Sequence, residues 1–325
     1  MKKYRLIIIG GGPAGLSAAL GAYSRGVDDI LLVDRNPTLG GLLCQCVHTG
    51  FGMKLFGEDL SGLEYAKRLI SLVDKTSIEI MTNTSTIGIS EDKTITLAGK
   101  NGLIELETDA LILASGCRER TIGSLPVVGT RPSGIFTAGS VQKMINIGGY
   151  SVGERIVILG SGDIGLIIAR RLTLEGKKVL VVVEKESSCG GLKRNKTLCL
   201  DAFGIPLLTS STVTKLHGRE RLSGVRICPV DENGHVIDEE GYDLECDTLV
   251  TSLGLIPELD LLWGLDTGME SDEGFVNDTC QTKLPWLFVC GNAREIRHFA
   301  DDIASDGTDA GENAADYLSS TEYFP

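Results

Sequence analysis

The sequence has little positive charge and no long hydrophobic run, and both absences restrict what the protein can do. Its 31 lysine and arginine residues are outnumbered by 44 aspartate and glutamate residues, which gives a formal net charge of −13. Nucleic-acid binding needs a basic surface to meet the phosphates, so nucleic acid is excluded as a partner. The apolar run 179–183 ends at a glutamate, far short of the roughly 18–20 residues that span a bilayer. The composition therefore predicts a soluble protein without a transmembrane segment.

The sequence also lacks the cysteine and histidine spacings of zinc and iron–sulfur sites. The 9 cysteines are scattered through 325 residues, and there are 4 histidines. No CxxCxxC run occurs and no Cys/His set has zinc-ligand spacing, so we expect no metal in this chain. A chain of this length does not need disulfides for stability. The cysteines therefore predict free thiols and a cytoplasmic protein.

Glycine, in contrast, is abundant, with 41 residues, and many of them lie in a sequence repeat. Residues 5–42 and 155–192 match in register, and each contains a GxGxxG motif between two apolar runs. The apolar runs are typical of strands buried on both faces, and the stretch between them is typical of a helix. Each copy is therefore predicted to be a βαβ unit. The predicted fold class is α/β, with two Rossmann-like, doubly wound, three-layer dinucleotide-binding domains.

The second repeat begins before the first domain is complete. Residues 286–292, WLFVCGN, form a further buried-strand pattern, which we assign to the first domain. We therefore expect a first domain of residues 1–117 and 249–325, with residues 118–248 inserted in it as the second domain. Alternating Thr, Ile and Leu in residues 78–107 predict a small β-meander in the first domain.

Each part of the first glycine motif has a physical function in dinucleotide binding. Gly10 permits the tight turn, Gly12 lets a pyrophosphate approach the backbone, and Gly15 allows the helix to pack closely on the strand. The helix N-terminus offers N–H groups and a positive dipole to the phosphates. Asp34, at the end of the next strand, can accept hydrogen bonds from an adenosine ribose. The neighbouring residues complete this predicted site: Pro13, Ala14 and Arg35.

The second glycine motif repeats this arrangement. Its predicted site consists of Gly160, Gly162, Asp163, Ile164, Gly165 and Glu184. Asp163 lies at a helix start, where its carboxylate is expected to cap free amides. The carboxylate of Glu184 would repel the 2′-phosphate of NADP, so we expect NAD(H) rather than NADP(H), although Lys185 follows it. Two dinucleotides in one chain imply electron transfer between them, and FAD with a nicotinamide is the pair whose redox chemistry fits.

The order of these motifs resembles the two-domain flavoproteins of the pyridine nucleotide-disulfide oxidoreductase superfamily, with the organisation of thioredoxin reductase. The motifs that carry the resemblance are the two glycine motifs, LILASG at 111–116, LVTSLG at 249–254 and LFVCGN at 287–292. The resemblance implies FAD at the first site and NAD(P)H in the inserted domain. It also implies cofactor contacts from Ala114, Gly116, Gly254, Gly291 and Asn292.

Two features at the C-terminal end follow from the same resemblance. Asn292 would contact the flavin ribityl chain, where the superfamily commonly has the Asp of a Gly-Asp pair. The helix that we expect at 306–318 would direct its N-terminus at the flavin's pyrimidine edge and stabilise negative charge there.

Three further stretches resemble small flavoprotein subunits found with glycerol-3-phosphate-type or amino-acid-type dehydrogenases, similar to those of hydrogen cyanide synthase, opine oxidase and dye-linked proline dehydrogenase. The stretches are 40–52, 116–121 and 160–176. The resemblance implies an oxidoreductase that exchanges hydride between NAD(H) and FAD and passes electrons to or from a partner. The implied partners are a small cysteine-rich or iron–sulfur protein and an FAD-dependent dehydrogenase subunit. A homo-oligomer is a further possibility.

Cys44, Gln45 and Cys46 follow a glycine pair, where the disulfide reductases place their redox cysteines beside the flavin. Gly41 and Gln45 are expected to contact the cofactor. A CxC disulfide would close a strained ring, and residues 133–153 lack the CxxC of thioredoxin reductase, but thiol-disulfide reduction through Cys44 and Cys46 stays an alternative. The other candidates here are a single functional thiol at Cys46 and a buried cysteine without chemistry.

His48 is the second predicted catalytic residue, because an imidazole with an ordinary pKa near about 6.5 can supply a proton as electrons move. A hydrogen-bonded structural histidine is the alternative. A third hypothesis for the whole chain is a structural subunit that holds FAD without turnover.

Two charged clusters have functional and structural interpretations. The residues at 118–120, RER, could form a salt-bridged hinge between the domains or a solvated cluster. Arg294, Arg297 and His298 could form a cationic rim for an anionic substrate or partner, or an exposed and partly paired set of charges.

Overall fold

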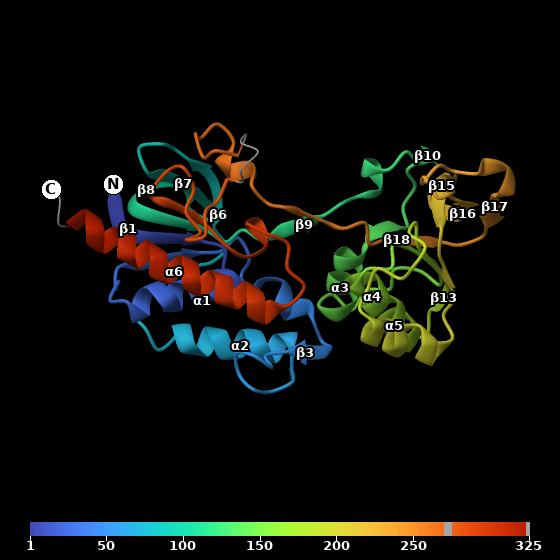
Figure 1. Cartoon of the computed structure of the whole chain (residues 1–325), viewed down its shortest axis with the longest axis horizontal. Coiled ribbons are helices and arrows are strands. Elements are labelled where there is room, and N and C mark those ends of the chain that lie inside the picture. Colours follow the sequence, from blue (N-terminus) through green and yellow to red (C-terminus); the bar gives the residue numbers. More distant parts are fainter. Residues whose placement is uncertain (270–274, 323–325) are drawn as a thin grey trace. The chain divides into compact units, whose positions relative to one another are not determined.

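The computed structural model describes residues 1–269 and 275–322, which divide into two compact units (Figure 1). The first unit comprises Met1–Arg118 and Pro257–Pro325, and the second comprises Glu119–Ile256. No helix in the described ranges has both the length and the apolar composition needed to cross a membrane.

The chain enters and leaves the second unit through two short strands that pair with each other, β9 (Cys117–Glu119) and β19 (Leu255–Pro257). The return to the first unit therefore lies later than residue 248, where we expected it. The reason is β18 (Thr248–Thr251), a fully buried strand that pairs in parallel with strands on both sides inside the second unit. Leaving such a strand outside its sheet would strip buried backbone groups of their hydrogen bonds.

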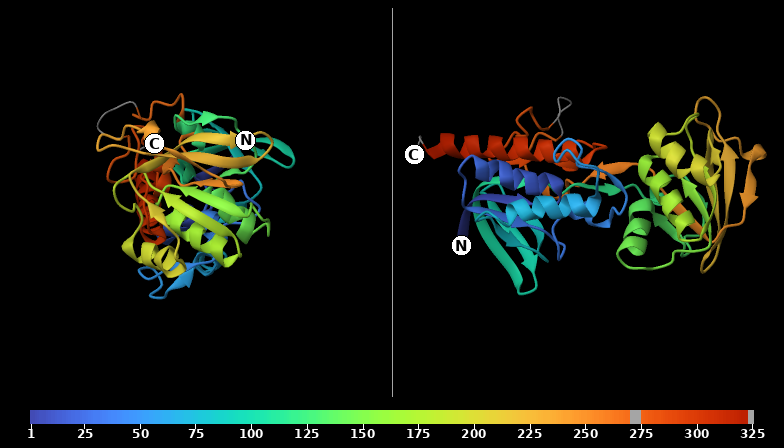
Figure 2. Two further views of the ribbon diagram at one scale, coloured as in Figure 1. Left: turned by 90° about the vertical axis from the view of Figure 1, so that its right-hand side faces the viewer. Right: turned by 90° about the horizontal axis from the view of Figure 1, so that it is seen from below.

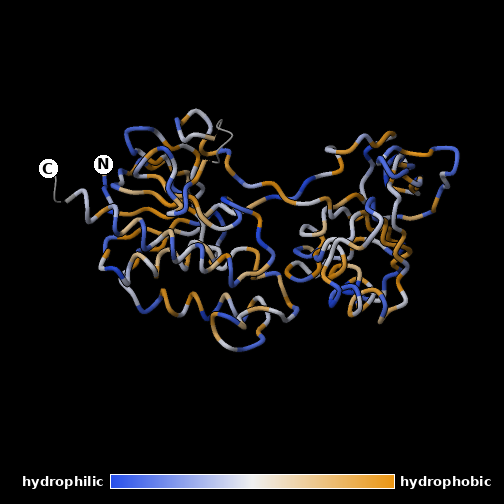
Figure 3. The backbone as a smooth tube through the Cα atoms, viewed as in Figure 1, coloured by the Kyte–Doolittle hydropathy of each residue, from blue (hydrophilic) through white to orange (hydrophobic). Residues whose placement is uncertain are grey.

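The first unit is built on a parallel sheet whose strands are strongly apolar, as the colouring in Figure 3 shows. In spatial order its strands are β5 (Glu79–Met81), β2 (Ile30–Val33), β1 (Lys2–Ile9), β8 (Gly102–Leu113) and β20 (Leu287–Val289). The direction of winding reverses beside β1, and ligands of open parallel sheets bind outside the carboxyl ends of the strands at such a point. The predicted meander is confirmed, since β6 (Ser85–Ile89) pairs antiparallel with β7 (Thr94–Gly99), and β7 pairs antiparallel with the first half of β8.

Alternate residues of β1 are buried in two different layers of the first unit. Leu6 and Ile8 pack beneath the helices, whereas Ile7 and Ile9 pack on the opposite face with meander residues such as Leu97. The helices are α1 (Pro13–Ser24), α2 (Gly62–Val73) and α6 (Ala300–Glu322), which Figure 2 shows side by side. The arrangement is the three-layer architecture expected from the sequence.

Helix α6 differs from the expectation because it begins at Ala300, before the predicted start at 306. Small residues let it lie close against α1. A Cβ at Gly307 or Gly311 would overlap the backbone of Ala14 or Ala18, respectively. One side of α1 is therefore packed at Ala14 and Ala18 directly against Gly307 and Gly311 of α6.

The second unit repeats the sheet order of the first. Its parallel strands are β14 (Leu207–Leu208), β13 (Lys178–Val183), β12 (Arg155–Leu159), β18 and β11 (Ile135–Thr137). Its helices are α3 (Ala138–Asn146), α4 (Asp163–Leu174) and α5 (Lys193–Cys199). A second sheet consists of β10 (Val128–Gly129), β15 (Ser211–Gly218), β16 (Leu222–Pro229) and β17 (Tyr242–Leu244).

One strand of this repeat is permuted in the chain. Beside β8 in the first unit lies β20, which comes late in the sequence, whereas β11 takes the corresponding place beside β18 and precedes the other strands of its parallel sheet. The insertion explains the difference, because β11 is the first strand of the parallel sheet that the chain reaches in the second unit, whereas the chain can complete the first unit only after leaving the second.

Candidate functional site

The first glycine loop joins β1 to α1 at the carboxyl edge of the sheet. Gly10 has φ +107°, and a Cβ there would overlap the carbonyl oxygen of Ala114. A Cβ at Gly15 would overlap the Gly10 carbonyl oxygen in the same way. Gly12 differs, because its φ of −77° suits any residue and the nearest atom to its added Cβ is Gly41 Cα at 4.0 Å. The fold requires the outer two glycines, whereas Gly12 leaves open space.

Asp34 ties this loop to the next strand. Its carboxylate is 6% exposed, and Oδ2 accepts the N–H of Gly11 at 2.7 Å. Oδ1 accepts the backbone and side-chain N–H groups of Asn36 at 2.7 and 3.1 Å. The carboxylate thus fixes the glycine loop through its hydrogen bond to Gly11. It also lies at the strand end, where a ribose would bind. Arg35, also predicted here, is exposed.

Helix α1 begins in a way that leaves its first turn available to an anion. Gly12 is its N-cap residue and Pro13 its first residue, and in the described part of the chain no side chain caps it. N–H groups in a first turn have no intrahelical partner, and the helix dipole adds positive potential. Ala14, in that turn, is 5% exposed. An open Gly12, an uncapped helix start and a carboxylate at the next strand fit the pyrophosphate and ribose of a dinucleotide.

The second glycine loop has the same construction. Gly160 has φ +102°, and its added Cβ would overlap the Ser252 carbonyl oxygen. The added Cβ of Gly165 would lie 2.5 Å from the Gly160 carbonyl oxygen, whereas that of Gly162 has ordinary contact with Ser252 Oγ at 3.6 Å. Here too the outer glycines are required by the fold and the middle one faces open space.

Glu184 holds the second loop as Asp34 holds the first. It is 9% exposed, and its Oε2 accepts the backbone N–H of Ser161 at 2.8 Å and the hydroxyl at 2.5 Å. Its Oε1 accepts the N–H of Glu186 at 3.0 Å. Lys185 is exposed. The two units therefore share the carboxylate-to-loop hydrogen bond as well as the spacing of the glycines.

Asp163 does not cap its own helix as expected. Its Oδ1 accepts the N–H of Leu192 at 2.8 Å and the side-chain amide of Asn195 at 2.7 Å, so it holds the start of α5 instead. No described side chain caps α4, whose N-cap residue is Gly162. Ile164, which follows, is half-buried and packs on the core of the second unit.

The turns after β8 and β18 place three more predicted residues. Ala114 continues the sheet by donating its N–H to Ile9 at 2.8 Å, and Gly116 follows in a left-handed conformation with φ +75°. Gly254 has φ +91°, and its carbonyl accepts the N–H of Arg120 at 3.0 Å. Gly116 and Gly254 both have open space around an added Cβ, so their positive φ alone requires glycine.

Gly291 and Asn292 follow β20 and reach the first glycine loop's helix. An added Cβ at Gly291 would lie 2.6 Å from Ala14 Cβ. Asn292 Oδ1 accepts the Arg297 N–H at 2.9 Å, and its Nδ2 donates to Cys117 Sγ at 3.6 Å. The carboxyl ends of β1, β8 and β20 thus meet around one place, as the sequence predicted.

Arg294 and Arg297 do not form the cationic rim considered for them. Both guanidinium groups donate to Asp306, at 2.8 and 3.2 Å, and Asp306 is 3% exposed. The buried carboxylate draws both side chains inward. His298 is exposed.

The cysteine segment forms a short 3₁₀ helix, η1 (Gly41–Gln45), packed near the first glycine loop. Cys44 donates its Sγ–H to the Leu39 carbonyl at 3.2 Å, and Cys46 donates to the Leu42 carbonyl at 3.4 Å. Both cysteines are free thiols. Burial, followed by the charge of Asp34, raises the pKa of Cys44. The segment therefore holds two thiols that bond to different carbonyls, with no disulfide between them.

Three other predicted residues lie in or beside this segment. Gly41, with φ +55°, faces Gly12 across the loop, and an added Cβ would be 3.0 Å from Gly12 Cα. Gln45 is buried. His48 is half-buried, with Nδ1 3.0 Å from the Thr49 carbonyl and its ring 5.1 Å from that of Phe51.

The charged residues at the linker have separate partners rather than one shared hinge cluster. Arg118 pairs with Glu258 at 3.0 Å and lies 3.6 Å from Asp260. Glu119 accepts the N–H of Gly139 at 2.9 Å, at the start of α3. This contact was not predicted. The likeness of GIFTAG at 134–139 to WLFVCG at 286–291 could have indicated that a strand ends just before Gly139.

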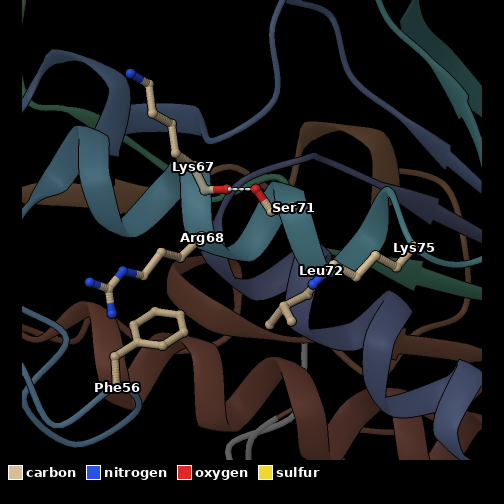
Figure 4. Close-up of a pocket in the computed structure, with 6 residues that line it drawn as sticks. All are labelled: Phe56, Lys67, Arg68, Ser71, Leu72 and Lys75. Carbon is tan, nitrogen blue, oxygen red and sulfur yellow. Dashed lines mark hydrogen bonds between the residues drawn. The ribbon is translucent and has the colours of Figure 1, made fainter.

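A hollow of about 330 Å³ lies on the outer side of α2 (Figure 4). Its lining residues are Phe56, Lys67, Arg68, Ser71, Leu72 and Lys75. Arg68 is paired with Glu58 at 2.7 Å, and none of the predicted site residues lines the hollow. The glycine loops therefore remain the candidate site.

The family model for pyridine nucleotide-disulphide oxidoreductases matches residues 4–307 of the chain. The chain belongs to this family. Membership implies binding of FAD and NAD(P)H, and the chain is an FAD-dependent NAD(P)H oxidoreductase. Both glycine loops lie within the matched residues, one in each unit.

Several curated proteins are similar to this pyridine nucleotide-disulphide oxidoreductase. Hydrogen cyanide synthase subunit HcnB of Pseudomonas aeruginosa is 28% identical over 90% of the chain and 67% of its own length. An opine oxidase subunit of Agrobacterium tumefaciens is 28% identical over 57% of the chain and 37% of its own length. Thioredoxin reductase of Listeria monocytogenes is 25% identical over 98% of the chain and 94% of its own length. The chain thus spans about two thirds of HcnB and about a third of the opine oxidase protein.

Solved structures confirm the fold of this oxidoreductase. Thioredoxin reductase of Lactococcus lactis has a TM-score of 0.77 at 18% identity, covering 98% of the chain and 99% of that structure. Thioredoxin reductase of T. acidophilum has a TM-score of 0.75 at 20% identity, covering 99% and 100%. The α/β architecture of two Rossmann-like domains predicted from the sequence is therefore correct.

Proposed function

We propose that this chain exchanges hydride between NAD(H) and FAD and passes the electrons to or from a partner dehydrogenase subunit. One observation carries the proposal: each unit has a glycine loop with an open middle glycine, held by a carboxylate from the end of the next strand. Flavin, when bound, can accept a hydride from a nicotinamide and release electrons to another acceptor.

We assign FAD to the first unit. The pyrophosphate would lie against Gly12 and the uncapped start of α1, and the adenosine ribose near Asp34, which is already held at the loop. We include Gly41 in this site because it lies next to Gly12 of the first glycine loop. We include Gly291 because it lies next to Ala14 in the first turn of α1. The remaining residues proposed to contact FAD are Gly10, Pro13, Ala14, Gly15, Arg35, Gln45, Ala114, Gly116 and Asn292.

We assign NAD(H) rather than NADP(H) to the second unit. Both carboxylate oxygens of Glu184 accept hydrogen bonds from the loop and strand, so this side chain is kept at the strand end. A fixed carboxylate there repels a 2′-phosphate and accepts the hydroxyls of an unphosphorylated ribose. The rest of the proposed site consists of Gly160, Gly162, Asp163, Ile164, Gly165 and Gly254.

Partner subunits are proposed from the names of the relatives. Hydrogen cyanide synthase subunit HcnB, the opine oxidase protein and the alpha subunit of sarcosine oxidase are all named as parts of larger assemblies. By this analogy, we propose that the chain is one subunit of a complex. The partners that we propose, a small cysteine-rich or iron–sulfur protein and an FAD-dependent dehydrogenase subunit, come from the sequence resemblance, and we propose that the complex is cytoplasmic.

Two residues near the first loop are proposed for proton and thiol chemistry. His48 is half-buried and has a ring nitrogen near a carbonyl, so it can be held in one orientation while it gives or takes a proton. Cys46 is buried, at 8% exposure, on the segment that faces the first loop.

Thiol-disulfide reduction through Cys44 and Cys46 is the second candidate function, favoured by the similarity to thioredoxin reductase over 98% of the chain. The raised pKa of the Cys44 thiol counts against it, because the thiolate is the reactive form. Cys46→Ser decides between the two functions. Loss of NADH-dependent reduction of a disulfide reagent would favour the reductase, and unchanged reduction of that reagent would remove this alternative.

An anaerobic titration of the purified flavoprotein with NADH and with NADPH tests the leading proposal. We expect the flavin absorbance to bleach with NADH at lower concentrations than with NADPH. A flavin that neither nucleotide bleaches would instead identify a structural subunit that holds FAD without turnover.

A further inference from the structure

Asp306 is a buried carboxylate in the second turn of α6 that belongs to none of the predicted sites. Its Oδ2 accepts the N–H of Gly291 at 2.6 Å, and its Oδ1 accepts the guanidinium groups of Arg294 and Arg297 at 2.8 and 3.2 Å. It is 3% exposed. A buried charge is costly to fold and needs paired donors, and here every donor comes from the single segment that follows β20.

This segment carries the residue that we place against FAD. Gly291 lies over the first turn of α1, since its added Cβ would be 2.6 Å from Ala14 Cβ. The next residue, Asn292, has its Oδ1 facing the backbone N–H of Arg297 at 2.9 Å, which determines which way the side-chain amide points. Asp306 thus binds both neighbours of Asn292: Gly291, which precedes it in the chain, and Arg297, whose backbone N–H donates to its Oδ1.

The buried negative charge of this cluster resides on Asp306, since Glu295, which lies 3.1 Å from Arg297, is exposed. Arg294 also lies 3.3 Å from the Sγ of Cys280, a second acceptor of that guanidinium. Burial, followed by the charge of Asp306, raises the pKa of Cys280 to about 11, so this thiol is neutral near pH 7. Without the carboxylate, two guanidinium groups would lose their common counter-charge.

We propose that Asp306 is a positioning residue for FAD: through Gly291 and Arg297 it holds Asn292 against the flavin, and its charge offsets the two arginines behind that site. The proposal rests on the proposed function, in which Asn292 contacts FAD. It assigns Asp306 a role through other residues, not a contact with the cofactor.

Asp306→Asn tests this inference, because the amide has the same shape and lacks the charge. We expect the dissociation constant of FAD, measured by flavin fluorescence, to rise by roughly 10- to 100-fold, the range for losing a hydrogen bond to a charged group. The reduction potential of the remaining bound flavin should shift in the positive direction, because a negative charge has been removed. Asp309→Asn, an exposed change three residues further along α6, is the matched control and should alter neither value.

A carboxylate with a purely structural role would lower the unfolding temperature and leave the flavin potential unchanged. That result, or wild-type FAD affinity in folded Asp306→Asn protein, overturns the inference while the proposed function stands. A wild-type protein without flavin overturns both. Should Asp306→Asn fail to fold, Arg297→Met is the second test, because the Arg297 side chain is partly exposed and its loss leaves the hydrogen bond from Gly291 to Asp306 in place. We expect a smaller rise in the FAD dissociation constant than for Asp306→Asn. No rise would overturn the inference.

Discussion

The middle glycine of each loop permits a test that separates cofactor binding from folding. Gly12 and Gly162 have φ of −77° and −63°, and neither added Cβ comes closer than 3.6 Å to a neighbouring atom outside its own turn. Alanine at a helix N-cap costs about 1 kcal/mol relative to the preferred residues. Losing a glycine from the unfolded chain returns about 0.4–1 kcal/mol. Gly12→Ala and Gly162→Ala should therefore change the free energy of unfolding by no more than about 1 kcal/mol.

Binding should respond far more than folding. The new methyl group would occupy the open side of the loop, where the pyrophosphate is expected to approach. Overfilling a packed site costs about 1–3 kcal/mol, which corresponds to roughly 5- to 150-fold in a dissociation constant. Gly12→Ala should lose FAD by this factor, whereas Gly162→Ala should keep its flavin and lose NADH affinity.

Flavin content after purification, fluorescence titration with FAD and anaerobic titration with NADH measure the two effects. Gly88→Ala is the control, because its added Cβ meets only Thr96 at 3.6 Å, in the meander away from both loops. Wild-type affinity for FAD in Gly12→Ala, together with wild-type affinity for NADH in Gly162→Ala, would refute the assignment of the loops as cofactor sites.

Other changes address the packing and the thiols. Gly15→Ala should lower the free energy of unfolding by about 1–3 kcal/mol, because its Cβ would overlap the Gly10 carbonyl oxygen. An unchanged melting temperature would contradict this. Gly307→Ala should destabilise the protein by a similar amount of about 1–3 kcal/mol, since its Cβ would overlap the Ala14 backbone in the α1–α6 contact. The rate of Cys44 alkylation, monitored by mass spectrometry across a pH series, should increase at a higher pH than the rate for free cysteine. The reason is that the raised pKa keeps the Cys44 thiol protonated to higher pH. Equal midpoints for Cys44 and free cysteine would show that burial does not protect it.

Local sequence was sufficient for the features that depend on a few consecutive residues. A buried strand, a glycine turn and a helix start all have short patterns, so both βαβ units and the fold class followed from spacing alone. Gly10 and Gly15 are required because neighbouring backbone atoms leave no room for a Cβ, a requirement that the motif already expresses. The place of Asp34 at the end of its strand also followed from local order.

Contacts between distant segments were beyond the reach of such patterns. Arg294 and Arg297 looked like surface charges because nothing near them in the sequence indicates a partner, yet Asp306 binds both. Asp163 bonds to Leu192 rather than to its own helix because the chain returns beside it after the following strand.

The assignment of residues 286–292, which include β20, to the first unit was predicted from the sequence, whereas the place of β11 beside β18 became visible only when strand neighbours were known. The sequence by itself determined the two glycine loops and their order, because close backbone packing restricts residue type locally. Which charges are buried, and that β11 completes the sheet of the second unit, was decided by tertiary structure, because burial and pairing depend on segments that meet only when the chain is folded.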